Sequence, residues 1–393
     1  MVDIKNIFTA KPPIILDSQL DQIKPDFVNV YVDVKNSAKA LYIKEVMAEI
    51  VNESLESEKL SSTIFQALIY YGSWWKFYLK QKNIKSRIVF FSDTGESEIY
   101  HKEISKKYKQ NRVTSKSNYT TLDDKFATIY RSNLELANNI LNRLPGVYYI
   151  KLKNLESDFV PEFLKTKLFN EPNNINIVCS SDKDMLQLLD DRTYMLFRQN
   201  QEDKIVSKTN AILHYSKSAG LKQTPEKLEQ VNKIDFKWLE AMMALVGDSI
   251  DDIEGVDKFG IAKAVDLFSD NETVSKIIGT PDELFNRVVT KNLFFKEEVT
   301  EEYSKKNKLS KPIINAIKEQ DTAVKAYKLI SFKSLVYTLD NFQTTSRNQI
   351  IQEIYTTATK SPETFLEYKT FRKSISNIKD IQLNENHLEA IYY

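Results

Sequence analysis

The stretch NIVCSSDKDMLQLLDD, residues 176–191, joins an apolar run to a cluster of acidic side chains. Asp182 and Asp184 stand one residue apart, and a strand would direct both carboxylates to one face because alternate side chains share a side. Like charges this close repel, so one carboxyl group would keep its proton near neutral pH unless a cation neutralises the pair. The stretch therefore predicts a divalent cation bound beside a buried strand.

Three other apolar runs resemble the one before Asp182. The candidate strands are FVNVYVD (27–33), SRIVFFSD (86–93), GVYYIKL (146–152) and NINIVCSSD (174–182). Segments with helical periodicity lie between them, for example residues 61–82 and 125–144. Strands that alternate with helices predict an α/β fold with a central, mostly parallel sheet flanked by helices on both faces.

Three of these candidate strands end in an aspartate: Asp33, Asp93 and Asp182. Ligands of open α/β sheets bind outside the carboxyl ends of the strands. We therefore expect these three side chains, which are distant in the chain, to converge on one site.

Composition sets the broad class of the protein. The chain has 393 residues, 42% of them hydrophobic, which is enough for two domains or for one large domain with an appendage. Its 55 basic and 54 acidic side chains give a net charge of +1, so the total charge does not by itself indicate nucleic acid. The sequence has no apolar run long enough to span a membrane, and Cys179 is its single cysteine. Charge and Pro break the short apolar patches at its start, so we expect no signal peptide there. We expect a soluble cytoplasmic protein without membrane contact.

Two further acidic pairs occur near the expected ends of elements, Glu156 with Asp158 and Asp248 with Asp251. Each pair alone could equally be a helix cap or a turn. An EF-hand loop does not fit, because Leu186 stands where such a loop beginning at Asp182 needs an oxygen ligand. The three histidines and Cys179 lack zinc-ligand spacing. Many hard oxygen ligands suit Mg²⁺ or Mn²⁺, and two such ions about 4 Å apart are suited to cleaving phosphodiesters.

Three ordered motifs resemble those of the 5′ nuclease family, which includes flap endonucleases, the 5′-3′ exonuclease domain of bacterial DNA polymerase I and phage ribonuclease H. The segment VCSSDKDMLQLLDD resembles the family's SGDKDLLQL motif, and LVGDSIDDIEGVDKFG resembles its helix-hairpin-helix motif GDSSDNIPGVPGIG. The segment SDTGESEIYHKEISKKYKQNR (92–112) resembles the family's aspartate followed by a basic helical arch. The segments NLESDF and VYVDVKNSAKALY resemble two further acidic motifs, so the joint match runs from residue 27 to about residue 270.

The resemblance implies a role for residues of three kinds. One metal ion would lie near Asp33, Asp93, Glu156, Asp158 and Asp182, and a second near Asp182, Asp184, Asp248 and Asp251. The scissile phosphate or threaded strand would contact Lys109 and Arg112, with Lys106 and Tyr108 beside them. The DNA backbone, and a K⁺ ion held by carbonyl groups, would contact Gly255, Val256, Lys258, Phe259, Gly260 and Lys263. The hairpin departs from the family motif at Asp257 and Lys258, which bears on the K⁺ site.

The implied architecture has three parts. Residues 1–200 would form a PIN-like nuclease core with a helical arch at about 95–125, residues 201–300 a helix-hairpin-helix region, and residues 301–393 a helical C-terminal extension. The implied activity is that of a metal-dependent 5′-3′ exonuclease or flap endonuclease acting on DNA replication intermediates, with ribonuclease H-type primer removal as a further activity. The expected setting is a monomer in the cytoplasm of a bacterial or phage-infected cell.

Alternatives remain at this stage. A haloacid-dehalogenase-like phosphatase would also carry a motif like VGDSIDD, but after a strand, whereas residues 237–246 have helical spacing. A non-catalytic DNA-binding replication scaffold could keep the same fold. The last ten residues, NENHLEAIYY (384–393), are either a packed terminus, which we favour, or a peptide for a sliding clamp. A single-strand binding protein is a further expected partner.

Overall fold

The computed structural model describes residues 14–34, 63–93, 99–110, 121–199, 202–341, 345–378 and 383–393. Arg112 and the central part of the predicted arch lie outside these residues. The first half contains α2 (Ile14–Ile23), β1 (Phe27–Asp33), α4 (Thr63–Gln81), β2 (Lys85–Asp93), α5 (Ile99–Ile104), α7 (Thr121–Leu141), β3 (Val147–Leu152), η4 (Ser157–Phe159), α8 (Val160–Lys167), β4 (Asn174–Cys179), η5 (Lys183–Leu188), β5 (Thr193–Gln199) and β6 (Glu202–Val206).

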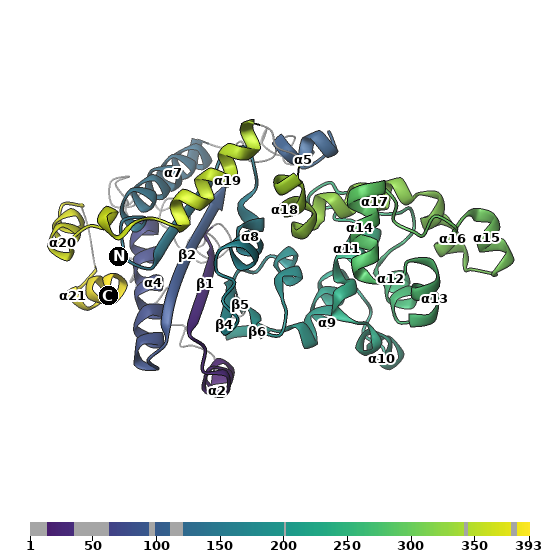
Figure 1. Cartoon of the computed structure of the whole chain (residues 1–393), viewed down its shortest axis with the longest axis horizontal. Helices are drawn as coiled ribbons and strands as arrows, with labels where there is room; N and C mark the ends of the chain where they lie inside the picture. Colours follow the sequence, from purple (N-terminus) through teal and green to yellow (C-terminus); the bar gives the residue numbers. More distant parts are fainter. Residues whose placement is uncertain are drawn as a thin grey trace.

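The second half is helical, as its polar, periodic sequence predicts. It contains α9 (Lys208–Ser218), α10 (Pro225–Lys233), η6 (Phe236–Trp238), α11 (Leu239–Val246), α12 (Ile261–Phe268), α13 (Asn271–Ile277), α14 (Pro281–Lys291), α15 (Glu301–Lys306), α16 (Lys311–Lys318), α17 (Gln320–Ile330), α18 (Phe332–Asn341), α19 (Thr345–Ala358), η7 (Pro362–Thr364), α20 (Tyr368–Ser376) and α21 (Glu385–Tyr392). Helices α9 to α17 form a lobe to one side of the sheet (Figure 1). None of the described helices combines the length and apolar character needed to cross a bilayer.

The described strands form one sheet in the order β3-β2-β1-β4-β5-β6. Strands β1 to β5 all run parallel to one another, and β6 runs antiparallel to β5. The predicted α/β class with a mostly parallel sheet is therefore confirmed. Strand order changes direction at β1, whose two neighbours in the sheet, β2 and β4, are distant in the chain, and such a switch point is where open α/β sheets bind ligands.

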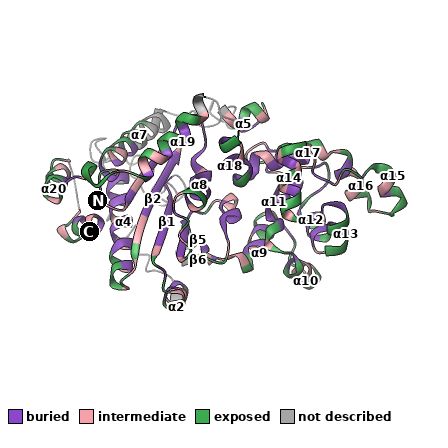
Figure 2. Ribbon diagram, viewed as in Figure 1, coloured by how far each residue is buried: buried purple, intermediate pink, exposed green. Residues whose placement is uncertain are grey.

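Strand β1 lies at the centre and is buried on both faces (Figure 2). Val28, Val30 and Val32 face one apolar core, which includes residues of α4 and α7, while Tyr31 belongs to the other core. Because side chains alternate along a strand, Asp33 lies on the same face as Tyr31. The continuous apolar sequence of β1 thus follows from helices covering both sides of a parallel sheet.

The last helices return to the sheet domain. Helix α21 packs along α4, where Leu388 and Ile391 are buried (Figure 1). The buried ammonium of Lys76 donates hydrogen bonds of 2.7 Å to the carbonyl oxygens of Pro145 and Ile391. The favoured interpretation of residues 384–393 as a packed terminus is confirmed.

Candidate metal centre

The first acidic group lies at the carboxyl edge of the sheet. Asp33 ends β1 and Asp93 ends β2, as their sequence positions predict. The hydroxyl of Ser180, just beyond β4, donates to Asp33 Oδ2 at 2.8 Å and accepts from the Asp182 amide at 3.1 Å. Ser180 therefore joins the ends of β1 and β4 at the switch point of the sheet.

The short helix η4 brings two more acids to this edge. The Ser157 amide donates to Asp93 Oδ1 at 2.6 Å, which fixes Glu156 and Asp158 beside the end of β2. Burial raises the pKa of Asp158 well above its ordinary value, and the charges of Asp93, Asp33, Asp182 and Glu156 raise it further. Carboxylates that raise each other's pKa in this way favour a bound cation.

One expectation about Asp182 and Asp184 is wrong. Strand β4 ends at Cys179, so the pair does not stand on one face of a strand. Asp182 instead caps η5, and its Oδ1 accepts from the Asp184 amide at 3.0 Å. Asp182 lies near both acidic groups, because its charge raises the pKa of Asp158 while the charges of Asp251 and Asp248 raise its own, and Asp184 lies with Asp248 and Asp251 in a second group.

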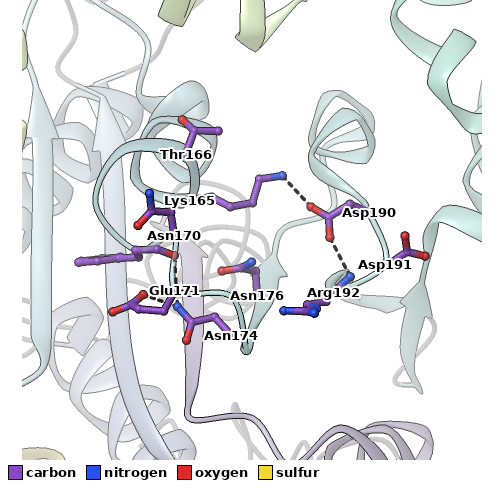
Figure 3. Close-up of a pocket in the computed structure, with 10 residues that line it drawn as sticks. Lys165, Thr166, Asn170, Glu171, Asn174, Asn176, Asp190, Asp191 and Arg192 are labelled. Carbon is purple, nitrogen blue, oxygen red and sulfur yellow. Dashed lines mark hydrogen bonds and ion pairs between the residues drawn. The ribbon is translucent and has the colours of Figure 1, made fainter.

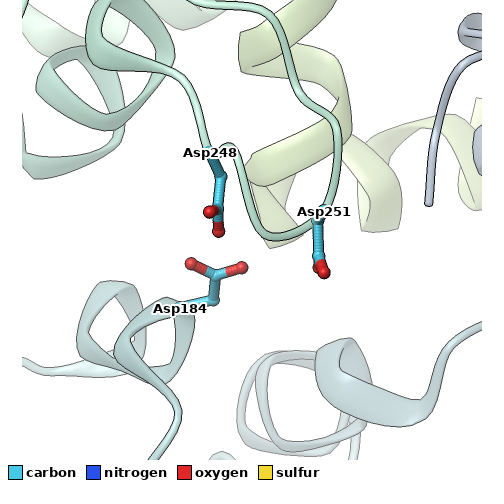
Figure 4. Close-up of side chains that lie close together, drawn as sticks. All are labelled: Asp184, Asp248 and Asp251. Atoms are coloured by element: carbon cyan, nitrogen blue, oxygen red, sulfur yellow. The ribbon is translucent and has the colours of Figure 1, made fainter. Parts of the chain in front are cut away.

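The second acidic group consists of Asp184, Asp248 and Asp251 (Figure 4). Each offers a carboxylate oxygen, and these oxygens lie within 4.8 Å of one another. Asp184 Oδ1 is buried and has no hydrogen-bond partner among the described residues. Burial, followed by the charges of Asp182 and Asp248, raises the pKa of Asp184 well above its ordinary value. A buried carboxylate oxygen without a donor, surrounded by other carboxylates, fits a hard divalent cation.

A tight loop after α11 positions Asp248 and Asp251. The Asp248 amide donates to the Ile253 carbonyl at 2.9 Å, and the Ile253 amide donates back at 2.8 Å. Gly247 has φ of 74°, and a Cβ atom on Gly255 would lie 2.2 Å from the Val246 carbonyl oxygen. These two glycines are therefore required for the loop to close on itself.

Lysine side chains contact both acidic groups. Lys109 Nζ lies 2.5 Å from Glu156 Oε1 and 3.4 Å from Asp251 Oδ2, so its ammonium lies between the two groups. The Tyr108 hydroxyl donates to the other oxygen of Glu156 at 3.0 Å. Burial raises the pKa of Glu156, and the charge of Lys109 opposes this rise. Lys183 Nζ lies 3.0 Å from Asp248 Oδ2.

Lys106 and Arg112 were also predicted to contact the nucleic-acid strand. Lys106 is exposed on the turn that follows α5, and Arg112 lies outside the described residues. Single-sequence reasoning missed Ser180 and Ser157, whose bonds to Asp33 and Asp93 depend on the fold, and it missed Lys183 although this residue stands between two predicted ligands.

The predicted DNA-binding hairpin separates into buried and exposed members. Val256 and Phe259 are buried, and Gly260 is the N-cap of α12. Lys258 is exposed, and its carbonyl oxygen accepts a hydrogen bond from the Lys263 ammonium. This contact engages one of the carbonyl groups that a K⁺ ion would need.

A separate polar hollow of about 380 Å³ lies at the amino ends of β4 and β5 (Figure 3). It is lined by Lys165, Thr166, Phe169, Asn170, Glu171, Asn174, Asn176, Asp190, Asp191 and Arg192. Several of these side chains bond to each other, as Lys165 Nζ does to Asp190 Oδ2 at 3.1 Å. The hollow lies at the opposite end of the strands from the acidic groups and shares no residue with them.

Comparison with known proteins finds similarity to the same family that the sequence motifs resemble. Residues 54–216 match the family of the 5′-3′ exonuclease, N-terminal resolvase-like domain. The chain is 28% identical over 199 residues to a 5′-3′ exonuclease of Buchnera aphidicola (Schizaphis graminum), covering 50% of this chain and 57% of that protein. It is 26% identical over 196 residues to a 5′-3′ exonuclease of Mycoplasmopsis pulmonis, covering 50% and 55%. The match thus spans about half the length of these relatives.

Solved structures show the likeness in fold. A complex of the bacteriophage T5 flap endonuclease with DNA and metal ions superposes with a TM-score of 0.56 at 13% identity, covering 85% of this chain and 100% of that one. The T5 protein co-crystallised with metal ions gives 0.55 at 14% identity, covering 84% and 99%. These structures share the fold of this chain, and the family match over residues 54–216 confirms the predicted resemblance to the 5′ nuclease family for that part of the chain.

Proposed function

We propose that this chain, whose residues 54–216 match the 5′-3′ exonuclease N-terminal domain family, is a metal-dependent 5′ nuclease that hydrolyses phosphodiester bonds in DNA replication intermediates. The observation that carries the proposal is the convergence of two carboxylate groups around one lysine. Oxygens of Asp184, Asp248 and Asp251 lie within 4.8 Å of each other, and the ammonium of Lys109 joins Asp251 to Glu156 in the first group.

Each acidic group would bind one metal ion. Asp33, Asp93, Glu156, Asp158 and Asp182 would hold one ion, and Asp182, Asp184, Asp248 and Asp251 a second. Mg²⁺ or Mn²⁺ suits this all-oxygen set, and a pair of such ions would activate water and stabilise the leaving oxygen. The carboxylates would hold the ions, and the partly exposed side chain of Asp184 offers its buried Oδ1 atom to one of them.

Basic side chains beside the acids would bind the nucleic acid. Lys109 would leave its bonds to Glu156 and Asp251 to contact the scissile phosphate, with Lys106 and Arg112 along the same strand. Tyr108 would keep Glu156 in place through its hydroxyl. Cations bring the phosphate backbone to an acidic centre that would otherwise repel it.

The hairpin after the second group would bind the duplex. Gly260 precedes α12, where free amide groups can contact phosphate, and Lys258 is exposed next to it. Gly255, Val256, Phe259 and Lys263 would shape this hairpin. A K⁺ ion there would have to share the Lys258 carbonyl with Lys263, so we propose that the ammonium itself takes that position.

The substrate class is inferred from the structurally similar flap endonuclease, which was crystallised with DNA. We propose branched DNA with a 5′ flap, and RNA–DNA primer junctions as a ribonuclease H-type activity. A sliding clamp or single-strand binding protein would act as partner on replicating DNA, and the nuclease would work as a monomer in the cytoplasm of a bacterial or phage-infected cell.

The phosphatase alternative loses support from local structure. The segment before VGDSIDD is the helix α11, whereas the phosphatase motif should follow a strand. The scaffold alternative is opposed by the buried, partnerless oxygen of Asp184, since an acidic cluster of this kind is unfavourable unless it binds a cation.

The deciding experiment incubates the protein with a labelled 5′-flap duplex in Mg²⁺ and in EDTA and resolves the products by length. Mg²⁺-dependent cuts near the flap junction would support a flap endonuclease, and short products from the 5′ end an exonuclease. If the flap is bound and never cut, the scaffold alternative replaces the proposal. If p-nitrophenyl phosphate is hydrolysed instead, the phosphatase alternative does.

A further inference from the structure

Gln187 is a buried amide that connects η5 to the junction between α17 and α18. Its Nε2 donates to the Asp184 carbonyl at 2.9 Å and to the Ile330 carbonyl at 3.0 Å. Its Oε1 accepts from the Phe332 amide at 2.7 Å. Both ends of the side-chain amide are therefore used, and all three partners are backbone groups.

With the bond from Gln187, both backbone polar groups of Asp184 are hydrogen-bonded. The Asp184 amide donates to Asp182 Oδ1, and the Asp184 carbonyl accepts from Gln187. The Asp184 carboxylate is left to face Asp248 and Asp251 (Figure 4). A short 3₁₀ helix such as η5 has poor hydrogen-bond geometry, so its orientation depends on anchors of this kind.

The junction that Gln187 contacts also supports the other side of the second group. Glu240 Oε2 on α11 accepts from the Tyr327 hydroxyl at 2.9 Å and from the Ser331 hydroxyl at 2.8 Å. Helix α11 leads directly into the loop that carries Asp248. Residues 327–332 thus bond to η5, which carries Asp184, and to α11, which precedes the loop that carries Asp248 and Asp251.

We propose that Gln187 is a positioning residue for the metal carboxylate Asp184, and that the α17–α18 junction braces the second acidic group through it. This gives the C-terminal helices, which lie beyond the matched residues 54–216, a part in the metal site. The inference deepens the proposed function and rests on it to the extent that Asp184 is a metal ligand. Residues that orient metal ligands typically change metal affinity by about 10- to 100-fold when replaced.

The test is calorimetric titration of the full-length protein with Mg²⁺, and separately with Mn²⁺, in the absence of DNA. Gln187→Met keeps the size of the side chain and removes its three hydrogen bonds, and we expect it to weaken the binding attributed to the second group by about tenfold or more. Asp184→Asn identifies that binding event, because it removes the negative charge of the ligand itself.

Asn142→Leu is the matched control. Asn142 exchanges two hydrogen bonds with the backbone of Tyr149 in β3, at 2.8 and 2.6 Å, and has no bond to the elements that carry the second acidic group, so its loss should lower thermal stability without changing the metal affinity of that group. Should Gln187→Met not fold, Gln187→Glu serves in its place. It keeps an acceptor for Phe332 and loses the donor, and a fall in metal affinity despite its added charge would support the inference.

Metal affinity in Gln187→Met equal to that of the wild type, with only melting temperature lowered, would overturn the inference and leave Gln187 as a packing residue. This readout does not require cleavage. A wild-type protein that binds metal and never cuts a flap would contradict the proposed function alone.

Discussion

Lys109 Nζ and Glu156 Oε1 lie 2.5 Å apart, and the two side chains are only 5% and 8% exposed. A buried ion pair of this kind offsets the desolvation of both charges only because each has further partners. Glu156 also accepts from Tyr108, and the Lys109 backbone amide donates to the Asp251 carbonyl at 3.0 Å. The lysine is thereby held between the two acidic groups.

Replacing this lysine should affect the chemical step. Lys109→Ala is expected to slow single-turnover cleavage of a 5′-flap duplex by about 100-fold, because it removes the cation that we propose stabilises developing charge. Lys107→Ala is the control, since Lys107 is adjacent, exposed and paired with Glu254. A cleavage rate in Lys109→Ala equal to that of the control would remove Lys109 from the reaction.

The second acidic group should be required for cleavage and dispensable for DNA binding. Asp184→Asn is expected to reduce the single-turnover rate by more than about 100-fold while DNA affinity in Ca²⁺, measured by fluorescence anisotropy, stays within a few-fold. Asp191→Asn lies in the same stretch but is exposed and bound to Lys208, so it should cleave like the wild type. Retained activity in Asp184→Asn would rule out the assignment of a metal ion to this group.

The two glycines that flank the hairpin should respond differently to a methyl group. Gly255→Ala would bring a Cβ atom against the Val246 carbonyl and is expected to lower the free energy of unfolding by about 1–3 kcal/mol. Gly260→Ala meets no atom within 4 Å, so its effect should stay below about 1 kcal/mol. Denaturant unfolding of the two variants measures the difference, and equal stabilities would mean that the loop relaxes.

Stability should rise with pH above neutrality because of Lys76. Burial, with the charge of Lys80 adding to it, lowers the pKa of Lys76 from 10.5 to about 7. Between these values the unfolded chain binds a proton that the folded chain does not, so the free energy of unfolding increases by about 1 kcal/mol per pH unit. Burial likewise lowers the pKa of Lys360 to about 7, which adds to the slope.

Denaturant unfolding at pH 7, 8 and 9 measures this slope. Lys76→Met should flatten it, and Lys217→Met, which replaces an exposed lysine, should leave it unchanged. A wild-type free energy of unfolding that falls over this range would contradict the assignment. The hydrogen bond from Lys76 to the Ile391 carbonyl makes docking of α21 the local event to follow by hydrogen exchange.

Sequence patterns were sufficient for the central fold because its strands are long, apolar and bounded by charge. The predicted strands 27–33 and 86–93 appear as β1 and β2 within one residue. Strands β5 and β6 were not predicted. Strand β6 is an edge strand of only five residues, three of them charged, and lacks the apolar signal that a buried parallel strand carries.

The acidic residues of the candidate site could be predicted from the sequence. The hydrogen bonds that hold them in position could not. Acids at element ends identified the eight carboxylates, because charge at the end of a buried strand is visible in one sequence. The error at Asp182 and Asp184 arose because a capping bond, which depends on three-dimensional geometry, ended β4 three residues early. The contacts of Gln187 with Ile330 and Phe332 join residues far apart in the chain, and no local pattern encodes them.

The order in which the acids occur along the chain matters for a protein that is made from its N-terminus on a ribosome. Asp33, Asp93, Glu156, Asp158, Asp182 and Asp184 emerge first, while the loop with Asp248 and Asp251 emerges much later. A nascent chain that ends before this loop lacks the partners of Asp184, so its acidic edge is only half assembled. The proposed hydrolysis would therefore have to wait until synthesis has passed the loop.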